Sequence, residues 1–267
     1  MNEILSTLIK KIVSPELSSS NIIKWGAPIP SFGDSSTSTV ATLGLNPSNR
    51  EFVDDNGDEL HGEKRRFHTL RSLGITSWDN IKNQHINLIH KSCNEYFFNN
   101  PYDNWFKSLD SLISGLGVSY YSKNLPAACH LDLVPYATNK KWGHLTTFQQ
   151  KQLLKYSDNS LATILHNSPI RILILNGASV IKGLNSTSTI KLTKTEMPSW
   201  ALPRKSGNDI KGYAYKGKLI NLLDTQFNKE ILVLGFNHNI QSSFGVTNVV
   251  KNNIKDWLQK QSTEIAL

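Results

Sequence analysis

The side chains of this sequence that could do chemistry stand at the ends of apolar runs. Asn46 follows the first run without a break, Asp132 lies near the end of the second, and His238 follows the last. In an open parallel sheet, ligands bind beyond the carboxyl ends of the strands, where such residues meet. An amide can orient a water molecule, a carboxylate accepts hydrogen bonds, and an imidazole can carry a proton near neutral pH. The sequence therefore predicts a polar site at one edge of a sheet.

Four apolar runs and the segments between them predict the elements that position these residues. The runs are rich in Val, Ile and Leu on both faces, which is typical of a parallel sheet covered by helices. Helical spacing of apolar residues predicts helices between the runs. The expected strands are residues 39–45, 127–134, 172–175 and 231–236, and the expected helices are residues 1–13, 57–74, 104–117, 146–167 and 247–261. The sequence therefore predicts the α/β fold class.

Length and composition predict a single domain that spans residues 1–267. No apolar run approaches the roughly 18 residues that a membrane span needs. The N-terminal segment has basic residues after its apolar ones and no small-residue cleavage site, so we expect an amphipathic helix, a cytoplasmic protein and no membrane partner. Cys93 and Cys129 lie far apart and cannot by themselves form a four-ligand metal or iron–sulfur site, so no metal is expected.

The chain is basic, with a net charge of +8 and a pI of about 9.3. Such a surface favours polyanions, nucleic acid first. Residues 182–218 are rich in Ser, Thr, Lys and Gly, and are expected to form a basic surface insertion with a small hairpin. The alternative for each basic cluster is a solvated face without a partner.

Three segments resemble motifs of the uracil-DNA glycosylase superfamily. They are "PIPSFGDSSTSTVATLGLNPSN" (28–49), with a Gly-x-Asn-Pro water-activating motif, "HLDLVPY" (130–136) at the base-recognition strand, and "LVLGFNHNIQSS" (232–243) at the histidine loop. The resemblance implies a three-layer α/β/α sandwich around a central four-stranded parallel sheet. It also implies a DNA glycosylase that flips a nucleotide and hydrolyses its N-glycosidic bond. Some members carry an iron–sulfur cluster, for which this sequence lacks the cysteines, so no cofactor is expected.

The resemblance assigns the catalytic roles to Asn46 and His238. The side-chain oxygen of Asn46 would hold the attacking water below the sugar, since an amide takes no proton near neutral pH and orientation matters most in a dissociative attack. His238 would stabilise the negative charge that develops on O2 of the base. The alternative is that Asn46 caps a turn, where asparagine is common. The further substrate-binding residues expected are Gly44, Leu45, Pro47, Ser48, Phe52, Asp132 and Asn239.

Two departures from the family pattern point to the base. Ser48 stands where the uracil-specific branch has a tyrosine that blocks substituents on C5 of the pyrimidine, so a larger C5 group has room. Asp132 stands near the asparagine that reads uracil, and an ionised carboxylate repels O4 of uracil but accepts from N4 of cytosine. We therefore expect a C5-modified cytosine, such as glucosylated hydroxymethylcytosine of phage DNA, to be excised in antiphage defence. The alternatives are a uracil-DNA glycosylase in base-excision repair, and a structural pairing of Asp132 with His130 or a lysine.

The DNA partner, single- or double-stranded, is expected to meet basic and aromatic residues. Ser242 is too small to fill the space left by a flipped base, so Gln241 or Phe244 is the better wedge. Phe52 and Phe67 are the candidates for stacking on the base, with the helix core as the alternative for Phe67. The expected DNA contacts are Lys140, Lys141, Trp142, Arg204, Lys205, Gln241, Ser242, Ser243 and Phe244, with Tyr136, Lys191 and Lys194 as further candidates.

No lysine is marked by a motif as a Schiff-base nucleophile, so a monofunctional enzyme is expected, acting as a monomer. A rival interpretation from a different class is a catalytically inactive DNA-binding protein of the same fold. It would share the basic surface and would keep Asn46 by chance.

Overall fold

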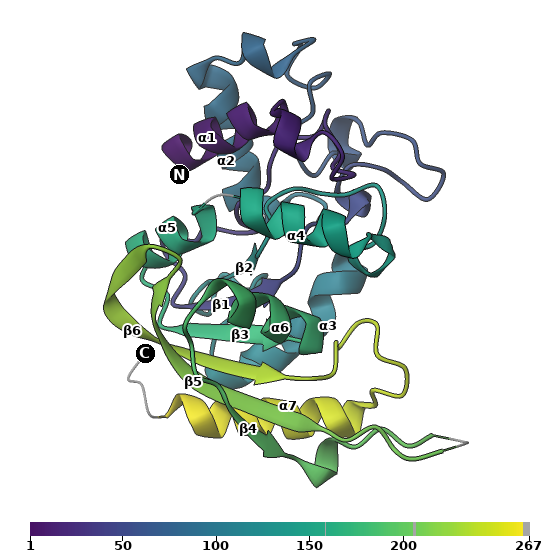
Figure 1. Cartoon of the computed structure of the whole chain (residues 1–267), viewed down its shortest axis with the longest axis vertical. Coiled ribbons are helices and arrows are strands. Elements are labelled where there is room, and N and C mark those ends of the chain that lie inside the picture. Colours follow the sequence, from purple (N-terminus) through teal and green to yellow (C-terminus); the bar gives the residue numbers. More distant parts are fainter. Residues whose placement is uncertain (158, 205–206, 264–267) are drawn as a thin grey trace.

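One six-stranded sheet forms the centre of the described structure. The computed structural model describes residues 1–157, 159–204 and 207–263. The strands lie in the order β2-β1-β3-β6-β5-β4 (Figure 1). Their bounds are β1 Val40–Gly44, β2 Ala128–Asp132, β3 Ile172–Asn176, β4 Thr193–Glu196, β5 Tyr213–Leu222 and β6 Thr225–Phe236. The α/β class predicted from the sequence is confirmed.

The sheet is mixed, so the expected central sheet of four parallel strands is not matched. The strands β2, β1, β3 and β6 are parallel neighbours and contain the four predicted apolar runs. The strand β5 pairs antiparallel with β6, and β4 pairs antiparallel with β5. All four residues of β4 are exposed, so this strand lacks the apolar pattern that reveals the others.

The stretch 182–218, predicted to be a basic surface insertion, is part of the fold at both of its ends. Lys182 lies within α6 (Ala178–Thr187), and β5 pairs with β6 along most of its length. The buried side chains of Ala214, Leu219 and Leu222 fix β5 to the rest of the sheet. The predicted hairpin is therefore the edge of the central sheet and not a separate excursion.

Most of the helices in the described residues lie where apolar spacing predicts them. Their bounds are α1 Asn2–Ile12, α2 Asn83–Asn94, α3 Asp103–Ile113, α4 Thr147–Tyr156, α5 Ser160–Asn167, α6 Ala178–Thr187 and α7 Asn248–Ser262. Residues 146–167 form two helices, α4 and α5, where one was expected. The helices α2 and α6 are not among the expected ones. In α2, Ile86, Ile89 and Cys93 have helical spacing and are buried.

The helix predicted for residues 57–74 is wrong. This segment contains a short 3₁₀ turn at Gly62–Lys64 followed by further turns. Gly57, Gly62 and Gly74 have φ angles of 89°, 56° and 67°, which a right-handed helix does not accommodate. The segment instead delivers Phe67 to the core.

Different helices cover the two faces of the sheet. Val40, Ile172 and Leu232 share an apolar cluster with α3 and α7, whereas Leu173 and Val233 share one with α5 and α6. A third cluster joins α1, α2 and α4, and α1 and α2 lie at the top of Figure 1. Within residues 1–157, 159–204 and 207–263, no helix has both the length and the apolar character needed to cross a membrane.

Candidate active site

Asn46 lies just beyond β1, where three acceptors hold its side-chain nitrogen. Nδ2 donates to Thr138 Oγ1 at 2.9 Å, to the Pro47 carbonyl at 3.0 Å and to the Tyr136 carbonyl at 3.4 Å. Thr138 gives its own hydroxyl proton to the Lys140 carbonyl at 2.7 Å, so it must accept from Asn46. This network fixes the amide orientation and turns Oδ1 away from the three acceptors.

The side-chain oxygen of half-buried Asn46 has no hydrogen-bond donor among the described residues. A turn-capping asparagine would use this oxygen on the backbone. The cap of the following 3₁₀ turn, Asn49–Glu51, is instead Ser48, whose hydroxyl accepts from the Arg50 amide at 3.2 Å. Asn46 is thus left with an oriented acceptor that can hold a water molecule.

The loop after β2 supports the loop that carries Asn46. The amides of Leu133 and Val134 donate to the carbonyls of Gly44 and Leu45 at 3.1 and 2.9 Å, so strand pairing continues past the strand ends. Tyr136, expected at a DNA groove, is buried, and its hydroxyl donates to the Leu8 carbonyl. Its role is therefore to fix this loop to α1.

A buried chain of polar contacts ends at Asp132. Tyr120 Oη lies 2.5 Å from Thr42 Oγ1, which lies 2.7 Å from His130 Nδ1, and His130 Nε2 lies 3.4 Å from Asp132 Oδ1. One arrangement of protons satisfies both hydrogen bonds: Tyr120 donates to Thr42, and Thr42 donates to Nδ1. The ring proton is then on Nε2, which faces the carboxylate at the longer distance of an ion-pair contact. The pairing of Asp132 with His130, left open by the sequence, is present.

Asp132 retains acceptor capacity in spite of this pairing. Its side chain is 3% exposed, and His130 is its one polar partner among the described residues. An ionised carboxylate offers about four lone-pair sites, so a single long contact leaves some of them under-satisfied. The carboxylate oxygens are not among the fully enclosed, unpartnered atoms of the described residues, so they keep contact with solvent. Its Oδ1 lies over Gly44, two residues before Asn46, where a Cβ atom would be only 2.3 Å away. The carboxylate therefore lies beside the Asn46 loop.

The absence of a side chain at Gly44 makes room for this carboxylate. In Gly44→Ala, the new Cβ would meet Asp132 Oδ1 at 2.3 Å and His130 Nε2 at 2.9 Å. We expect the free energy of unfolding to fall by about 3 kcal/mol, measured by urea denaturation. Gly143→Ala is the matched control, since nothing lies within 4 Å of its added Cβ. Equal stability of the two variants would contradict the placement of Asp132.

Glu51 is a buried acid on the same loop that the sequence analysis does not single out. It lies five residues after Asn46, and its Oε2 accepts from the Tyr96 hydroxyl at 2.8 Å. Burial raises the pKa of Glu51 to about 7, and the charge of Asp132 acts in the same direction, while Tyr96 and Arg66 oppose the rise. The charged residue looks like part of a solvated turn in the sequence, and only the fold reveals its burial.

The two aromatic rings proposed to stack on a base lie in the core. Phe52 packs edge-on against Trp25 at 5.7 Å, and Phe67 stacks on Tyr96 at 5.1 Å. Both side chains are buried. The core alternative for Phe67 is therefore present, although in a turn and not in a helix, and the stacking role of the two rings stays a prediction.

No hydrogen bond among the described residues links His238 to Asn46. The ring is buried, and its Nε2 lies 2.8 Å from the Trp200 carbonyl. A carbonyl only accepts, so Nε2 carries the ring proton and donates it to the Trp200 carbonyl. Burial lowers the pKa of His238, with Arg204 acting in the same direction and the Trp200 contact opposing it. This geometry leaves no ring proton for a base.

The loop after His238 is held by its own asparagine. Asn239 Oδ1 accepts from the amides of Gln241 and Ser242, and its carbonyl accepts from the Ser243 amide. Asn239 thus organises the loop, and no hydrogen bond among the described residues links it to Asn46.

The two proposed wedges, Gln241 and Phe244, differ in freedom. The side chain of Gln241 accepts from Asn176 at 2.7 Å and donates to the Trp105 carbonyl at 3.0 Å, so it is fixed. Phe244 is 80% exposed and has the Arg204 guanidinium 5.3 Å from its ring centre. Phe244 is therefore the wedge candidate that the geometry favours.

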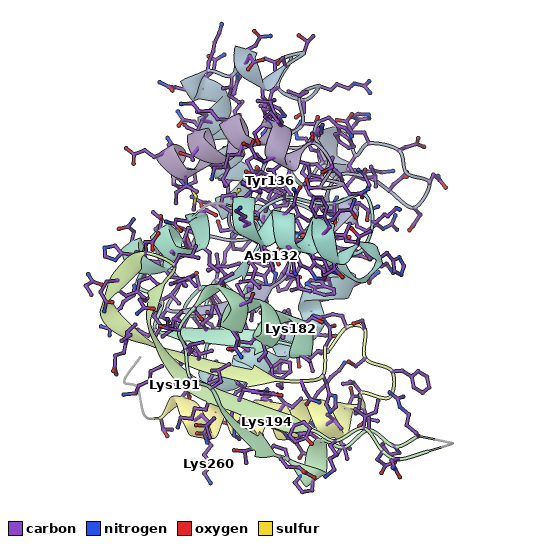
Figure 2. The ribbon with its side chains drawn as sticks, in the orientation of Figure 1. Asp132, Tyr136, Lys182, Lys191, Lys194 and Lys260 are labelled. Carbon is purple, nitrogen blue, oxygen red and sulfur yellow. The ribbon has the colours of Figure 1, made fainter. Side chains whose placement is uncertain are left out.

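The remaining expected DNA contacts lie on separate surfaces. Lys140 and Lys141 are exposed, close in sequence to Thr138, and Trp142 is half-buried against the cluster of α1, α2 and α4. Lys205 lies outside the described residues. Figure 2 shows Lys191 and Lys194 well away from Asp132, and Lys194 lies 3.7 Å from the centre of the Tyr213 ring.

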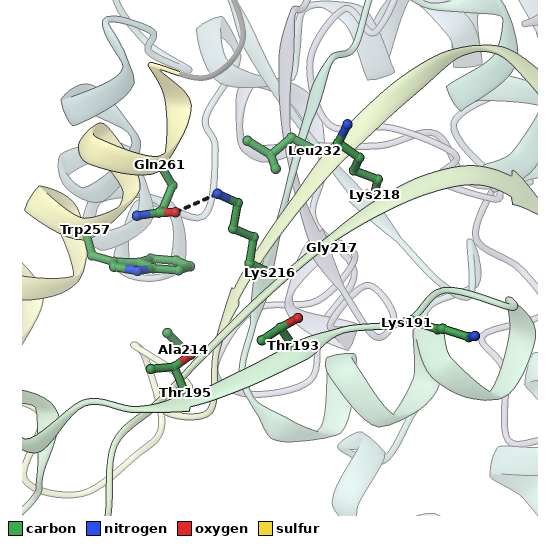
Figure 3. A pocket seen from close by; sticks show the side chains of 10 residues that line it. All are labelled: Lys191, Thr193, Thr195, Ala214, Lys216, Gly217, Lys218, Leu232, Trp257 and Gln261. Atoms are coloured by element: carbon green, nitrogen blue, oxygen red, sulfur yellow. Dashed lines mark hydrogen bonds between the residues drawn. The ribbon is translucent and has the colours of Figure 1, made fainter.

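A cavity of about 510 Å³ lies between the β4–β5 edge and α7 (Figure 3). Lys191, Lys216 and Trp257 line it, and Lys216 donates to Gln261 Oε1 at 2.8 Å. The sheet order puts this cavity at the opposite edge from β2, so its lysines are not part of the site around Asn46. In the described ranges, no three His, Cys, Asp or Glu side chains gather as a metal site would require.

A comparison of the chain with protein-family models finds no match, and a search of curated proteins finds none either.

Proposed function

We propose that this protein is a monofunctional DNA glycosylase of the uracil-DNA glycosylase type that releases a C5-modified cytosine from DNA. The observation that carries the proposal is the oriented, unpartnered side-chain oxygen of Asn46, beside the under-satisfied carboxylate of Asp132. The proposed fold is the corresponding three-layer sandwich, in which β2, β1, β3 and β6 supply the four parallel strands and β5 and β4 are an addition. The product is an abasic site, and the proposed setting is antiphage defence.

In the proposed reaction, Asn46 Oδ1 accepts a hydrogen bond from a water molecule placed below the flipped sugar. The C1′–N1 bond breaks first, and its electron pair leaves with the base. The oriented water then forms the C1′–O bond and loses its proton to solvent, since an amide does not take it up, and the departing base anion takes up a proton from solvent. Fixing the water by a rigid amide contributes through orientation.

The base would be read by Asp132 and admitted past Ser48. The carboxylate accepts from the N4 amine of cytosine and repels O4 of uracil. Ser48 is exposed at the start of the Asn49–Glu51 turn, and its small side chain leaves space for a C5 substituent. This combination favours a modified cytosine over uracil.

The proposal is tested by following free base by mass spectrometry. The protein is incubated separately with duplex DNA that contains glucosylated hydroxymethylcytosine, with uracil-containing duplex, with uracil-containing single strand and with plain DNA. Release of the modified cytosine alone is the expected result. Release of uracil alone would contradict the modified-cytosine substrate and support a uracil-DNA glycosylase in repair. Release of no base would refute the glycosylase proposal.

A second candidate is a DNA-binding protein of this fold without catalysis, and His238 is the observation that favours it. Its ring proton is committed to the Trp200 carbonyl, so the charge-stabilising group expected of a glycosylase is engaged elsewhere. Binding to modified DNA without release of base, even with the protein in large excess over the DNA, would support this candidate.

Phe244→Ala tests the proposed wedge. The ring is exposed, so we expect the free energy of unfolding to change by less than about 0.5 kcal/mol. Base release from duplex should fall by about tenfold because nothing would fill the space of the flipped base, whereas release from single strands should not change. The matched control is Phe148→Ala, which removes an exposed ring on α4. Equal losses on both kinds of DNA would exclude a wedge.

A further inference from the structure

The Glu51 carboxyl group is buried in the candidate site with one oxygen in use and one free. Oε2 accepts from Tyr96, whose hydroxyl also accepts from the Tyr102 amide at 2.9 Å. No described residue donates to Oε1, and the whole residue is 2% exposed. Oε1 is not among the fully enclosed side-chain atoms of the described residues that lack a partner, so it keeps contact with solvent and can be reached by a ligand.

Two carboxyl groups of unequal character thus border the same loop. Asp132 Oδ1 lies 3.4 Å from Nε2 of the His130 imidazole. Glu51 has the hydroxyl of Tyr96 as its polar contact and feels the negative charge of Asp132. When two carboxyl groups lie in one site, their environments separate their roles, and the less supported one keeps its proton.

We infer that Glu51, in its protonated form, donates a hydrogen bond to N3 of the flipped cytosine while Asp132 accepts from its N4 amine. This inference rests on the proposed function and names how that site selects its base. The pair presents an acceptor and a donor, which complement the N4 donor and the N3 acceptor of cytosine. Uracil presents O4 and N3–H, which is the reverse pattern, so both contacts would fail.

The groups around Glu51 predict how this contact depends on pH. Tyr96 and Tyr121 keep their protons because burial raises the pKa of both above the usual range. The positive charge of Arg66 opposes the rise in the pKa of Glu51. The pKa of Glu51 is about 7, so its donor is present below this value and is lost above it. Ionised Glu51 would then place an oxygen lone pair against the N3 lone pair of cytosine, and the two would repel each other.

Glu51→Gln separates this role from a merely structural one. A glutamine accepts from Tyr96 as Glu51 does and offers an amide donor at every pH. Base release from duplex with glucosylated hydroxymethylcytosine is measured in single turnovers between about pH 5 and about pH 9. The wild-type rate should fall about tenfold per pH unit above the pKa of Glu51, and the variant rate should stay flat. Parallel profiles of the two proteins would overturn the inference.

A binding arm keeps this test apart from the test of catalysis. Affinities of wild type and Glu51→Gln for cytosine-type and uracil-type duplexes are measured at about pH 6 and at about pH 8. Preference for the cytosine-type duplex should weaken at the higher pH in wild type only. If no base is released but this preference is seen, the glycosylase proposal falls and the inference stands. If base is released and the preference does not respond to pH or to the substitution, the inference alone falls.

Discussion

Asn46→Ala should abolish base release while leaving DNA binding intact. The substitution removes the acceptor that orients the water, and we expect the single-turnover rate to fall by about 10³-fold. The affinity for DNA should stay within about twofold, since the half-buried amide contacts only the protein's own acceptors. Release of base by mass spectrometry and binding by fluorescence anisotropy measure the two effects. A variant that retains its rate would show that Asn46 only supports the loop.

Substitutions of Thr138 test whether the Asn46 amide must be held in one orientation or only needs to be present. Thr138→Ser keeps the hydroxyl that accepts from Asn46 and donates to the Lys140 carbonyl, whereas Thr138→Val keeps the shape and loses both bonds. The valine variant should lose about 10- to 100-fold in rate with Asn46 present, and the serine variant should stay near wild type. Because Thr138 is buried, urea unfolding of both variants is needed to confirm that they fold.

The features of this fold that follow from local pattern are the ones that the sequence predicts. The strands β1, β2 and β3 are buried along their whole length and overlap the predicted apolar runs. Asn46 lies two residues beyond β1, so both its position and its edge of the sheet could be expected. The strand β4 and the true conformation of residues 57–74 depend on partners or on glycine φ angles, which no hydrophobic period encodes.

The direction in which a side chain points was beyond the sequence pattern. His238 follows β6 as expected, yet its ring bonds to the Trp200 carbonyl from a turn 38 residues earlier. Glu51 looks like a surface charge until Tyr96 and Asp132 are placed around it by distant parts of the chain. Long-range packing decides both outcomes, so a motif can predict which residue types meet but not which contacts they make.

Asp132→Asn should shift the preference from cytosine towards uracil. An asparagine both donates and accepts, so it can hydrogen-bond O4 of uracil, which the carboxylate repels. We expect the ratio of cytosine-type to uracil-type release to fall by about 100-fold or more, since both substrates change in opposite directions. Nε2 of His130 can still donate to the new side-chain oxygen, so the hydrogen-bond chain from Tyr120 should persist and stability should change little.

The double variant Ser48→Tyr with Asp132→Asn tests the role of Ser48 in admitting a C5 substituent, and it also serves as a control for the single variant. Ser48 is exposed, so the larger ring can be accommodated without disturbing the core. The double variant should exclude any C5-substituted base yet release uracil as the single variant does, because uracil carries only hydrogen at C5. Single-turnover release from matched duplexes with uracil, thymine, cytosine and glucosylated hydroxymethylcytosine measures this. If Asp132→Asn keeps the wild-type preference, then the carboxylate serves His130 alone, and the base is selected by some other group.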